Sequence, residues 1–358
     1  MAWYFRRAIM ALLFIAYIAF SAIPAYADDV NILAKSAIVY CPDSGEILYS
    51  KNADAKMQMA STTKIMTTIL ALESGELDER FTVDEDAIMV EGSSMGLLPG
   101  DVVTKRILCY GMMLPSGNDA ANATAVKLGG DVDLFVDMMN EKAHELGLEN
   151  TNFVTPSGLD DYTDEHYSTA YDMAKLTAYA LENEDFREIC KTQNVKFELK
   201  NGRTVALYNS NRLLSTLEGC IGVKTGFTDK AGRCLITAVE RNGATLICVT
   251  LRDSDDWRDH IELYKHCFNM LDTVEVGDVH VNIPVVGSDI LIAKLKCDTE
   301  SITLFQGEES KLTKKIYAPR FIYAPMQNGD SVGKVIYYLN GNEVISLDLK
   351  LSEDISIY

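Results

Sequence analysis

A serine and a lysine three residues apart, Ser61 and Lys64, form the most reactive pair that the sequence offers. Ser61 directly precedes residues 62–73, whose apolar spacing predicts a helix, so it lies at or near the helix N-terminus. Positions i and i+3 of a helix share a face, so the hydroxyl and the amine would lie side by side. A lysine can activate a serine if its surroundings favour the neutral amine or if it relays a proton. A helix N-terminus also offers backbone N–H groups to a developing oxyanion.

The Ser-x-x-Lys pattern alone is weak, because an N-cap serine followed by a solvated lysine looks the same. A second fragment, Ser116-Gly117-Asn118, follows Pro115 and precedes another helical segment. Such a loop is a frequent place for catalytic groups. Its serine could relay protons, and its asparagine could hydrogen-bond a substrate amide.

The third fragment is Lys224-Thr225-Gly226, which follows the apolar residues 221–223 of an expected edge strand. The lysine offers a positive field and the threonine a hydroxyl for a carboxylate, while the glycine lets a substrate backbone approach closely. Each fragment is common by itself. The three fragments in this order are specific.

Together the fragments resemble the signature of penicillin-binding proteins and class A β-lactamases. Gly117 stands where those β-lactamases place an aspartate, and here the sequence resembles the low-molecular-mass D-Ala-D-Ala carboxypeptidases of peptidase family S11. The resemblance runs from about residue 35 to residue 271, and more loosely through residues 324–333. Four segments carry most of it: residues 60–67, 115–121, 166–172 and 222–228.

The resemblance implies a nucleophile at Ser61, a base of acylation at Lys64 and a proton relay at Ser116. Ser61 would attack the carbonyl between two D-alanines of a peptidoglycan stem peptide. The terminal D-alanine would leave, and water would hydrolyse the acyl-enzyme. β-Lactams would mimic the dipeptide and act as inhibitors. Neither a metal nor an organic cofactor is expected.

The resemblance also implies residues that bind the substrate. Asn118 would bind the substrate amide and the region of Lys64, and Lys224 with Thr225 would hold the terminal carboxylate. The oxyanion hole would use the backbone N–H groups of Ser61 and Phe227. A histidine or tyrosine is frequent at position 227 in relatives, so only a backbone role carries over. The full expected set is Asn118, Lys224, Thr225, Gly226 and Phe227.

The predicted elements form an α+β fold. Apolar alternation predicts four strands, at residues 36–41, 46–51, 232–240 and 244–251. Helical spacing predicts six helices, at residues 62–73, 105–113, 119–128, 132–146, 169–182 and 256–271. We therefore expect residues 28–273 to form a β-lactamase/transpeptidase-like domain, in which an antiparallel sheet packs against a helical layer. Residues 274–358, with short β-branched runs between turns, predict a small all-β domain.

The N-terminus predicts export. Arg6 and Arg7 precede an apolar run at residues 8–20, and Ala25-Tyr26-Ala27 is a small-x-small cleavage site, so residues 1–27 resemble a signal peptide. The alternative is an uncleaved anchor, although the run is shorter than the ~20 residues that span a bilayer. We expect an extracytoplasmic protein. Residues 343–351 alternate with period two and predict a strand, so no C-terminal membrane anchor is expected.

Composition excludes several classes. A net charge of −19 argues against nucleic acid as a partner, because phosphates require basic patches. The eight cysteines are scattered in apolar contexts and predict buried thiols. Neither a CxxC pair nor an HExxH motif occurs, so a metal site has no support.

The sequence also admits two rival activities and contains one misleading motif. A β-lactamase would need a deacylating glutamate, and the surroundings of Glu165 do not fit. A penicillin-binding sensor or scaffold would still acylate at Ser61 but would lack turnover. Residues 92–96 match the G-x-S-x-G nucleophile elbow, yet Pro99 and Gly100 follow at once, which favours a loop at the edge of a cleft.

Overall fold

A computed structural model describes residues 30–358, except residues 161 and 242. The expected signal peptide, residues 1–27, lies outside the described residues. Two compact units divide the described chain: residues up to 239 with 245–265, and residues 240–244 with 266–358. The domain boundary expected between residues 273 and 274 stays a prediction.

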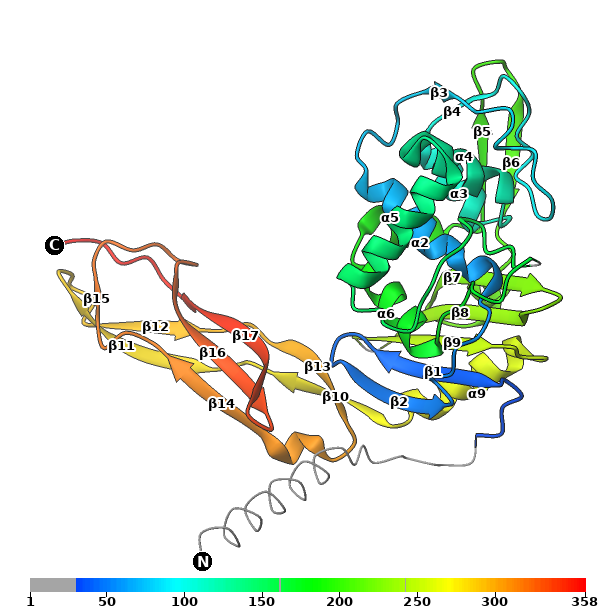
Figure 1. Cartoon of the computed structure of the whole chain (residues 1–358). Helices are drawn as coiled ribbons and strands as arrows, with labels where there is room; N and C mark the ends of the chain where they lie inside the picture. Colours follow the sequence, from blue (N-terminus) through cyan, green and yellow to red (C-terminus); the bar gives the residue numbers. More distant parts are fainter. Residues whose placement is uncertain (1–29, 161, 242) are drawn as a thin grey trace, which may run out of the picture. The chain divides into compact units, whose positions relative to one another are not determined.

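A five-stranded sheet forms the base of the first unit (Figure 1). Its order is β2-β1-β9-β8-β7, and the pairs β1–β2, β1–β9 and β7–β8 are antiparallel. The two sequence ends of the unit meet there, since Ser36 in β1 lies opposite Leu251 in β9. Strand β7 is at an edge, as predicted. The strands are β1 (Ser36–Cys41), β2 (Glu46–Lys51), β7 (Cys220–Thr228), β8 (Gly232–Arg241) and β9 (Ala244–Leu251).

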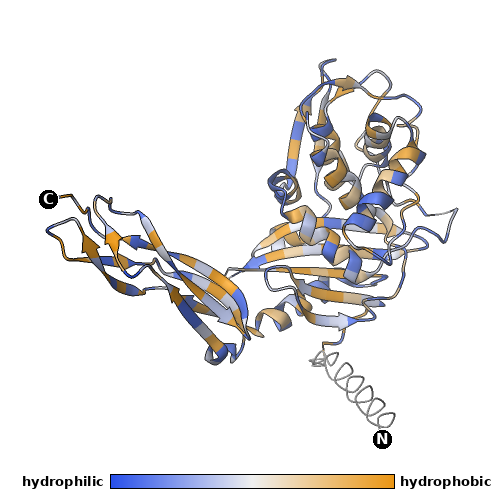
Figure 2. Cartoon of the chain, turned by 60° about the vertical axis from the view of Figure 1, so that its left-hand side comes forward, coloured by the Kyte–Doolittle hydropathy of each residue, from blue (hydrophilic) through white to orange (hydrophobic). Residues whose placement is uncertain are grey.

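Helices cover both faces of this sheet (Figure 1). On one face lie α2 (Lys64–Glu73), α3 (Lys105–Met113), α4 (Asn118–Gly129), α5 (Val132–Glu145) and α6 (Ala170–Leu181); α9 (Asp256–Phe268) lies on the other. Every residue of α2 from Lys64 to Leu72 is buried, as expected for a helix in the middle of a core. Apolar residues likewise run along the central strands (Figure 2). The predicted helical layer and antiparallel sheet are therefore confirmed.

Local signals explain where several helices begin. The side chains of Thr104, Asp131, Thr169 and Asn183 each accept a backbone N–H at a helix N-terminus. A 3₁₀ turn, η1 (Ala60–Thr63), precedes α2, so the helix predicted from residue 62 begins at Lys64. The closing helix ends at Phe268 rather than at residue 271, because Leu271 begins a strand.

Several short elements of the first unit were not predicted. Helix α7 (Glu184–Lys191) follows α6 directly, and α8 (Leu213–Thr216) precedes β7. Strands β5 (Asn194–Glu198) and β6 (Thr204–Tyr208) form a hairpin, and β3 (Phe81–Thr82) pairs with β4 (Val102–Val103).

Among its described residues the second unit is all-β apart from the last residues of α9 and a 3₁₀ turn, η2 (Glu308–Lys311). Six strands form one sheet in the order β14-β16-β17-β12-β11-β15, and β10 pairs with β13. Alternate residues of β12 and β17 face its own core. Its strands are β10 (Leu271–Val276), β11 (His280–Val286), β12 (Ile292–Lys296), β13 (Glu300–Phe305), β14 (Leu312–Tyr317), β15 (Ile322–Tyr323), β16 (Ser331–Leu339) and β17 (Asn342–Leu351).

The all-β expectation for this unit is confirmed, and the strand predicted at residues 343–351 is β17. Within residues 30–358, leaving aside 161 and 242, no helix has both the length and the apolar character needed to cross a bilayer.

Candidate active site

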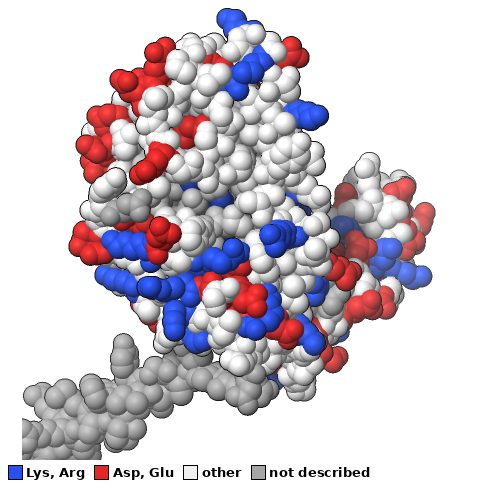
Figure 3. All heavy atoms as spheres, turned by 90° about the vertical axis from the view of Figure 1, so that its right-hand side faces the viewer, with Lys and Arg blue, Asp and Glu red and all other residues white. Residues whose placement is uncertain are grey.

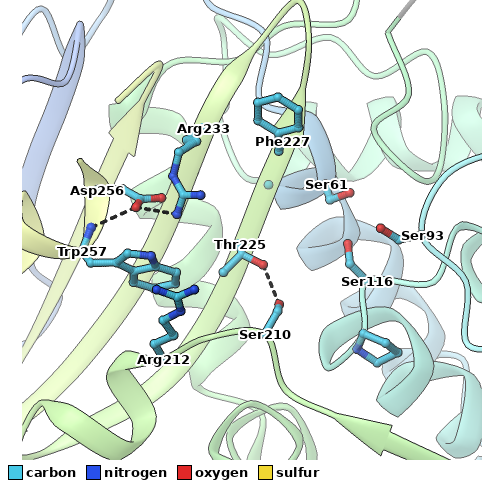
Figure 4. Close-up of a pocket in the computed structure, with 12 residues that line it drawn as sticks. Ser61, Ser93, Ser116, Ser210, Arg212, Thr225, Phe227, Arg233, Asp256 and Trp257 are labelled. Atoms are coloured by element: carbon cyan, nitrogen blue, oxygen red, sulfur yellow. Dashed lines mark hydrogen bonds and ion pairs between the residues drawn. The ribbon is translucent and has the colours of Figure 1, made fainter. Parts of the chain in front are cut away.

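A pocket of about 340 Å³ opens between η1, the loop before α4 and strand β7 of the first unit (Figure 4). Five of the eight predicted site residues line it, and the other three are buried beside them. The five are Ser61, Ser116, Thr225, Gly226 and Phe227. The buried three are Lys64, Asn118 and Lys224. The fold thus brings together residues that are up to 166 positions apart in the chain.

A chain of hydrogen bonds between buried residues fixes the turn that carries Ser61. Ala60 has a left-handed backbone with φ 49°, which is strained for a residue with a side chain. Its carbonyl accepts a hydrogen bond from Thr63 Oγ1 at 2.8 Å, and Thr63 Oγ1 lies 2.8 Å from His166 Nε2. Val154 N–H donates to His166 Nδ1 at 2.9 Å, so the ring proton is on Nε2, facing Thr63. His166 therefore fixes the backbone beside Ser61 without reaching the pocket.

Lys64 is fully buried and meets three oxygen atoms. Its amine lies 2.9 Å from Ser61 Oγ, 2.8 Å from Asn118 Oδ1 and 2.6 Å from the carbonyl oxygen of Ser157. Two of these oxygens, those of Asn118 and Ser157, can only accept hydrogen bonds. A neutral amine therefore gives its two protons to them and keeps its lone pair for the hydroxyl of Ser61. That arrangement can remove the proton of the serine.

Burial makes both site lysines easier to deprotonate. Loss of solvent holds the pKa of Lys64 well below its usual value; the charge of Lys224 adds to this, and Asp119 opposes it. Loss of solvent likewise lowers the pKa of Lys224 to about 7, with a small opposing effect of Cys190. Lys224 is 1% exposed, and its amine donates to the carbonyl oxygen of Thr225 at 2.7 Å.

Asn118 and Asp119 tie the loop of residues 91–97 to the start of α4. Asn118 Nδ2 donates to the carbonyl oxygen of Glu91 at 2.7 Å. The buried carboxylate of Asp119 accepts from the backbone N–H groups of three successive loop residues, Met95, Gly96 and Leu97. It also accepts from Ser94 Oγ at 2.6 Å. Ser94, the serine of the G-x-S-x-G match, is thus a structural hydroxyl in a loop rather than a residue of a strand–turn–helix elbow.

Ser116 faces the nucleophile across the pocket. Its backbone is left-handed, with φ 67°, and its hydroxyl makes no hydrogen bond within the described part of the chain. Figure 4 shows the hydroxyl groups of Ser61, Ser93 and Ser116 turned toward the same part of the pocket. Ser116 is therefore placed to exchange a proton with a bound substrate.

Strand β7 forms the opposite wall and passes very close to the nucleophile. A Cβ atom on Gly226 would lie 3.2 Å from Ser61 N and 3.2 Å from the carbonyl oxygen of Met59, which explains the glycine. Thr225 Oγ1 lies 2.7 Å from Ser210 Oγ, and the ring of Phe227 stands 63% exposed at the pocket mouth. The free edge of β7 can pair with an extended peptide.

Comparison with known proteins decides the family. The family model described as D-alanyl-D-alanine carboxypeptidase matches residues 23–255, and the model described as the C-terminal domain of penicillin-binding protein 5 matches residues 268–356. The chain belongs to the D-alanyl-D-alanine carboxypeptidase family. It is therefore a serine-type D-Ala-D-Ala carboxypeptidase, as the motifs predicted. Neither comparison favours the sensor or scaffold alternative.

Two relatives of this carboxypeptidase cover nearly its whole length, and a third covers about two thirds of it. The D-alanyl-D-alanine carboxypeptidase DacF of Bacillus subtilis is 31% identical over 334 residues, which is 90% of this chain and 85% of that protein. Penicillin-binding protein 5 of Haemophilus influenzae is similar in structure, with a TM-score of 0.65, 29% identity and coverage of 92% of this chain and 99% of that chain. The Streptomyces K15 DD-transpeptidase has a TM-score of 0.63 and 34% identity, covering 68% of this chain and 100% of that chain.

Sequence reasoning missed several residues of this carboxypeptidase site. Ser157 contributes only a backbone carbonyl, which leaves no mark in a sequence. Asp119 directly follows Asn118, and an acidic residue in the first turn of a helix was a usable signal. The end of the pocket away from Ser61 adds four more, from the loop before α8, strand β8 and the start of α9: Arg212, Arg233, Asp256 and Trp257.

Proposed function

We propose that this carboxypeptidase removes the terminal D-alanine from peptidoglycan stem peptides through an acyl intermediate on Ser61. Lys64 Nζ takes the proton of Ser61 Oγ as Oγ attacks the carbonyl carbon of the penultimate D-alanine. The tetrahedral oxyanion is stabilised by the backbone N–H groups of Ser61 and Phe227. Its collapse breaks the peptide bond, and the leaving amine takes a proton from Lys64 through Ser116.

Deacylation repeats these steps with water. Lys64 removes a proton from the water molecule, the hydroxide attacks the ester carbonyl, and Ser61 Oγ leaves and regains a proton. Asn118 would bind an amide of the substrate, and Thr225 would contact the terminal carboxylate. The glycine at 226 allows the substrate backbone to lie against β7. β-Lactams would acylate the same Oγ and hydrolyse slowly.

One observation carries the proposal: the buried amine of Lys64 lies 2.9 Å from Ser61 Oγ while its other contacts are carbonyl oxygens. That geometry provides a buried base directly beside a serine that lines the pocket. The lowered pKa of Lys64, caused by burial, favours the neutral form that a base needs.

The test uses protein that begins at residue 28 and an acyl-D-Ala-D-Ala peptide, with released D-alanine quantified. Ser61→Ala should remove all release above background, since loss of a nucleophile in a concerted site costs up to ~10⁶ in kcat. Ser93→Ala, which removes a second hydroxyl from the same pocket, is the matched control and should retain release. Mass spectrometry after incubation with a penicillin should place the acyl group on the peptide that contains Ser61. Acylation of another residue would overturn the assignment.

We also propose that the enzyme is exported and acts outside the cytoplasm, which rests on the leader at residues 1–27. Cleavage after Ala27 would leave Asp28 as the new N-terminus. N-terminal sequencing of the protein recovered from the extracytoplasmic fraction tests this. An intact Met1 on membrane-bound protein would support an uncleaved anchor instead.

A further inference from the structure

The loop of residues 91–97, which contains the G-x-S-x-G match, is joined to the first two residues of α4. The carbonyl oxygens of Glu91 and Ser93 accept the side-chain and the backbone N–H of Asn118, each at 2.7 Å. The carboxylate of Asp119 accepts three successive backbone N–H groups of the loop in return. The loop and the start of α4 therefore fix each other's position.

These contacts decide which atom of the Asn118 amide meets Lys64. An asparagine amide has an oxygen that accepts and a nitrogen that donates, and the two groups have nearly the same shape. Because the carbonyl oxygen of Glu91 accepts from Nδ2, the oxygen Oδ1 faces the amine of Lys64, at 2.8 Å. An amide turned the other way would direct its N–H groups at the amine and compete for the lone pair that Ser61 needs. The position of the Glu91 carbonyl thus matters for the base.

Two glycines allow the loop and α4 to pack this closely. A Cβ atom on Gly92 would lie 2.7 Å from Asn118 Nδ2, so the first glycine of the G-x-S-x-G match is a packing requirement. A Cβ atom on Gly117 would lie 2.6 Å from Asp119 Oδ1. Gly117, which stands where class A β-lactamases place an aspartate, therefore leaves room for a carboxylate two positions later in the chain.

Asp119 holds the loop through both of its oxygens. Oδ1 accepts the N–H of Met95 at 2.9 Å. Oδ2 accepts the hydroxyl of Ser94 at 2.6 Å and the N–H groups of Gly96 and Leu97 at 3.0 Å each. Hydrogen bonds to a carboxylate are stronger than those to a neutral oxygen. An amide in this place would turn its own N–H groups toward some of these donors, so the loop would lose part of its support.

The charge of Asp119 also acts on the base. Both groups lie beneath surface charges such as those in Figure 3, since Asp119 is 2% and Lys64 is 0% exposed. Water and salt therefore screen their attraction less than they screen surface charges. Loss of solvent lowers the pKa of Lys64, the charge of Lys224 in β7 lowers it further, and Asp119 opposes both. His166, in the loop before α6, also interacts electrostatically with Lys64.

We infer that Asp119 is a positioning residue of this carboxypeptidase: by holding the loop of residues 91–97, it fixes the amide of Asn118 with its oxygen toward Lys64. The inference rests on the proposed function and deepens it, since it explains how the proposed base keeps a lone pair for Ser61. Asp119 does not line the pocket, so it acts through Asn118 and the loop rather than on the substrate.

The experiment measures acylation by a penicillin as a function of pH in the wild type and three variants. Asp119→Asn removes the charge and part of the support of the loop. Ser94→Ala removes one donor and keeps the charge. Asp172→Asn is the matched control, because Asp172 is 3% exposed, lies in the first turn of α6 and accepts the N–H of Asn150 at 2.8 Å, outside the pocket.

A second readout does not depend on acylation. Carbon-13 NMR of lysine-labelled protein follows the titration of Lys64 in the wild type and the same variants, and Lys64→Arg identifies its signal. Urea unfolding shows that each variant is folded.

Asp119→Asn should slow acylation by about 10- to 100-fold, because the Asn118 amide is no longer held in place. It should also move the rising limb of the pH profile and the NMR midpoint of Lys64 to lower pH, since the charge that opposes deprotonation is gone. Ser94→Ala should slow acylation by about 3- to 10-fold and leave the limb in place. Asp172→Asn should lower the stability and also leave the limb in place.

A wild-type rate in Asp119→Asn would overturn the inference and leave the carboxypeptidase intact, and so would a slow Asp119→Asn whose limb and NMR midpoint stay in place. If Asp119→Asn does not fold, Ser94→Ala decides, and a wild-type rate in that variant would overturn the inference. Absence of acylation in the wild type would instead overturn the proposed function, and the NMR midpoints would still decide the role of Asp119.

Discussion

The Nε2 atom of His166 lies 2.8 Å from Thr63 Oγ1, across 103 positions of sequence, and so links the loop before α6 to the turn that presents Ser61. The hydroxyl of Thr63 in turn donates a hydrogen bond to the carbonyl oxygen of Ala60, whose backbone is left-handed. A strained turn persists only where its surroundings hold it. The position of the nucleophile thus depends on a buried histidine that does not line the pocket.

His166→Ala should therefore disturb the position of Ser61 without changing the acid–base chemistry. We expect acylation by a penicillin to slow, and the free energy of unfolding to fall by about 2–4 kcal/mol, because the N–H of Val154 and the hydroxyl of Thr63 lose a buried partner. Stopped-flow acylation and urea unfolding measure the two effects. A positioning role predicts an unchanged pH profile; a displaced limb would show that His166 takes part in proton transfer.

Acid should destabilise this protein through two buried histidines. Burial lowers the pKa of His166 to about 4 and that of His260, which lies between Thr237 and Thr250, to about 3. An unfolded histidine has a pKa of about 6.5, so below that pH the unfolded state binds the extra protons. Stability is complete above about pH 6.5 and falls as the pH approaches 3–4, by up to about 3 and 5 kcal/mol for the two groups.

Urea unfolding at pH 7, 5.5 and 4 tests this slope. His260→Gln should flatten it, although the variant will be less stable at pH 7. The matched control is His280→Gln, since His280 is 72% exposed in its side chain and pairs with the exposed Asp278. A slope that stayed the same in His260→Gln and changed in His280→Gln would contradict the assignment.

Lys64→Arg should abolish base catalysis while keeping a cation at the same position. Arginine stays protonated at any working pH, so acylation should slow by about 10²- to 10⁴-fold. In the wild type the rate should rise with pH as Lys64 loses its proton, at a pH below the ordinary lysine range because burial lowers its pKa. Lys105→Arg is the matched control, because Lys105 is also buried but donates to Ser74 outside the site. A rising limb that survived in Lys64→Arg would point to another base.

Gly226→Ala should push strand β7, the wall of the pocket, away from the turn that carries Ser61. The new Cβ would lie 3.2 Å from Ser61 N and from Ala60 Cβ, so the turn or the strand must shift by a few tenths of an ångström. Small displacements in a site can cost up to ~10²-fold in rate, and we expect acylation to fall by about 10- to 100-fold with little loss of stability. Phe227→Ala provides the contrast, because it keeps the backbone N–H and should retain most of the acylation rate. Equal losses in both variants would argue for a side-chain role of Phe227.

The elements that position the site could be predicted where local patterns are strong. Helix α3 begins and ends where its apolar spacing predicts, and the bounds of β1, β2 and β9 match the predicted strands. The reason is that an element buried on one face has apolar residues at a regular spacing in its sequence. The β5–β6 hairpin was missed although Asn201-Gly202 lies at its turn, a signal typical of hairpins.

The contacts of the site could be predicted only in part. The three fragments place Ser61, Lys64 and Asn118 together because their order and spacing are specific, and the structure puts Asn118 Oδ1 2.8 Å from the amine of Lys64. The positions of the carbonyl oxygen of Ser157 and of the side chain of Arg212 at the pocket depend on how loops distant in sequence pack together. Such long-range contacts have no local signature in a single sequence.

The depth at which the two site lysines lie has a practical consequence for chemical attachment. A lysine with a lowered pKa is ordinarily the amine that acylating reagents find first at neutral pH, because more of it is uncharged. Here Lys64 is 0% and Lys224 is 1% exposed, so reagents in solution meet the charged surface lysines instead. Coupling the enzyme to an amine-reactive resin should therefore modify its surface lysines and leave Lys64 and Lys224 unmodified. Ser61, which faces the pocket, should stay free to be acylated.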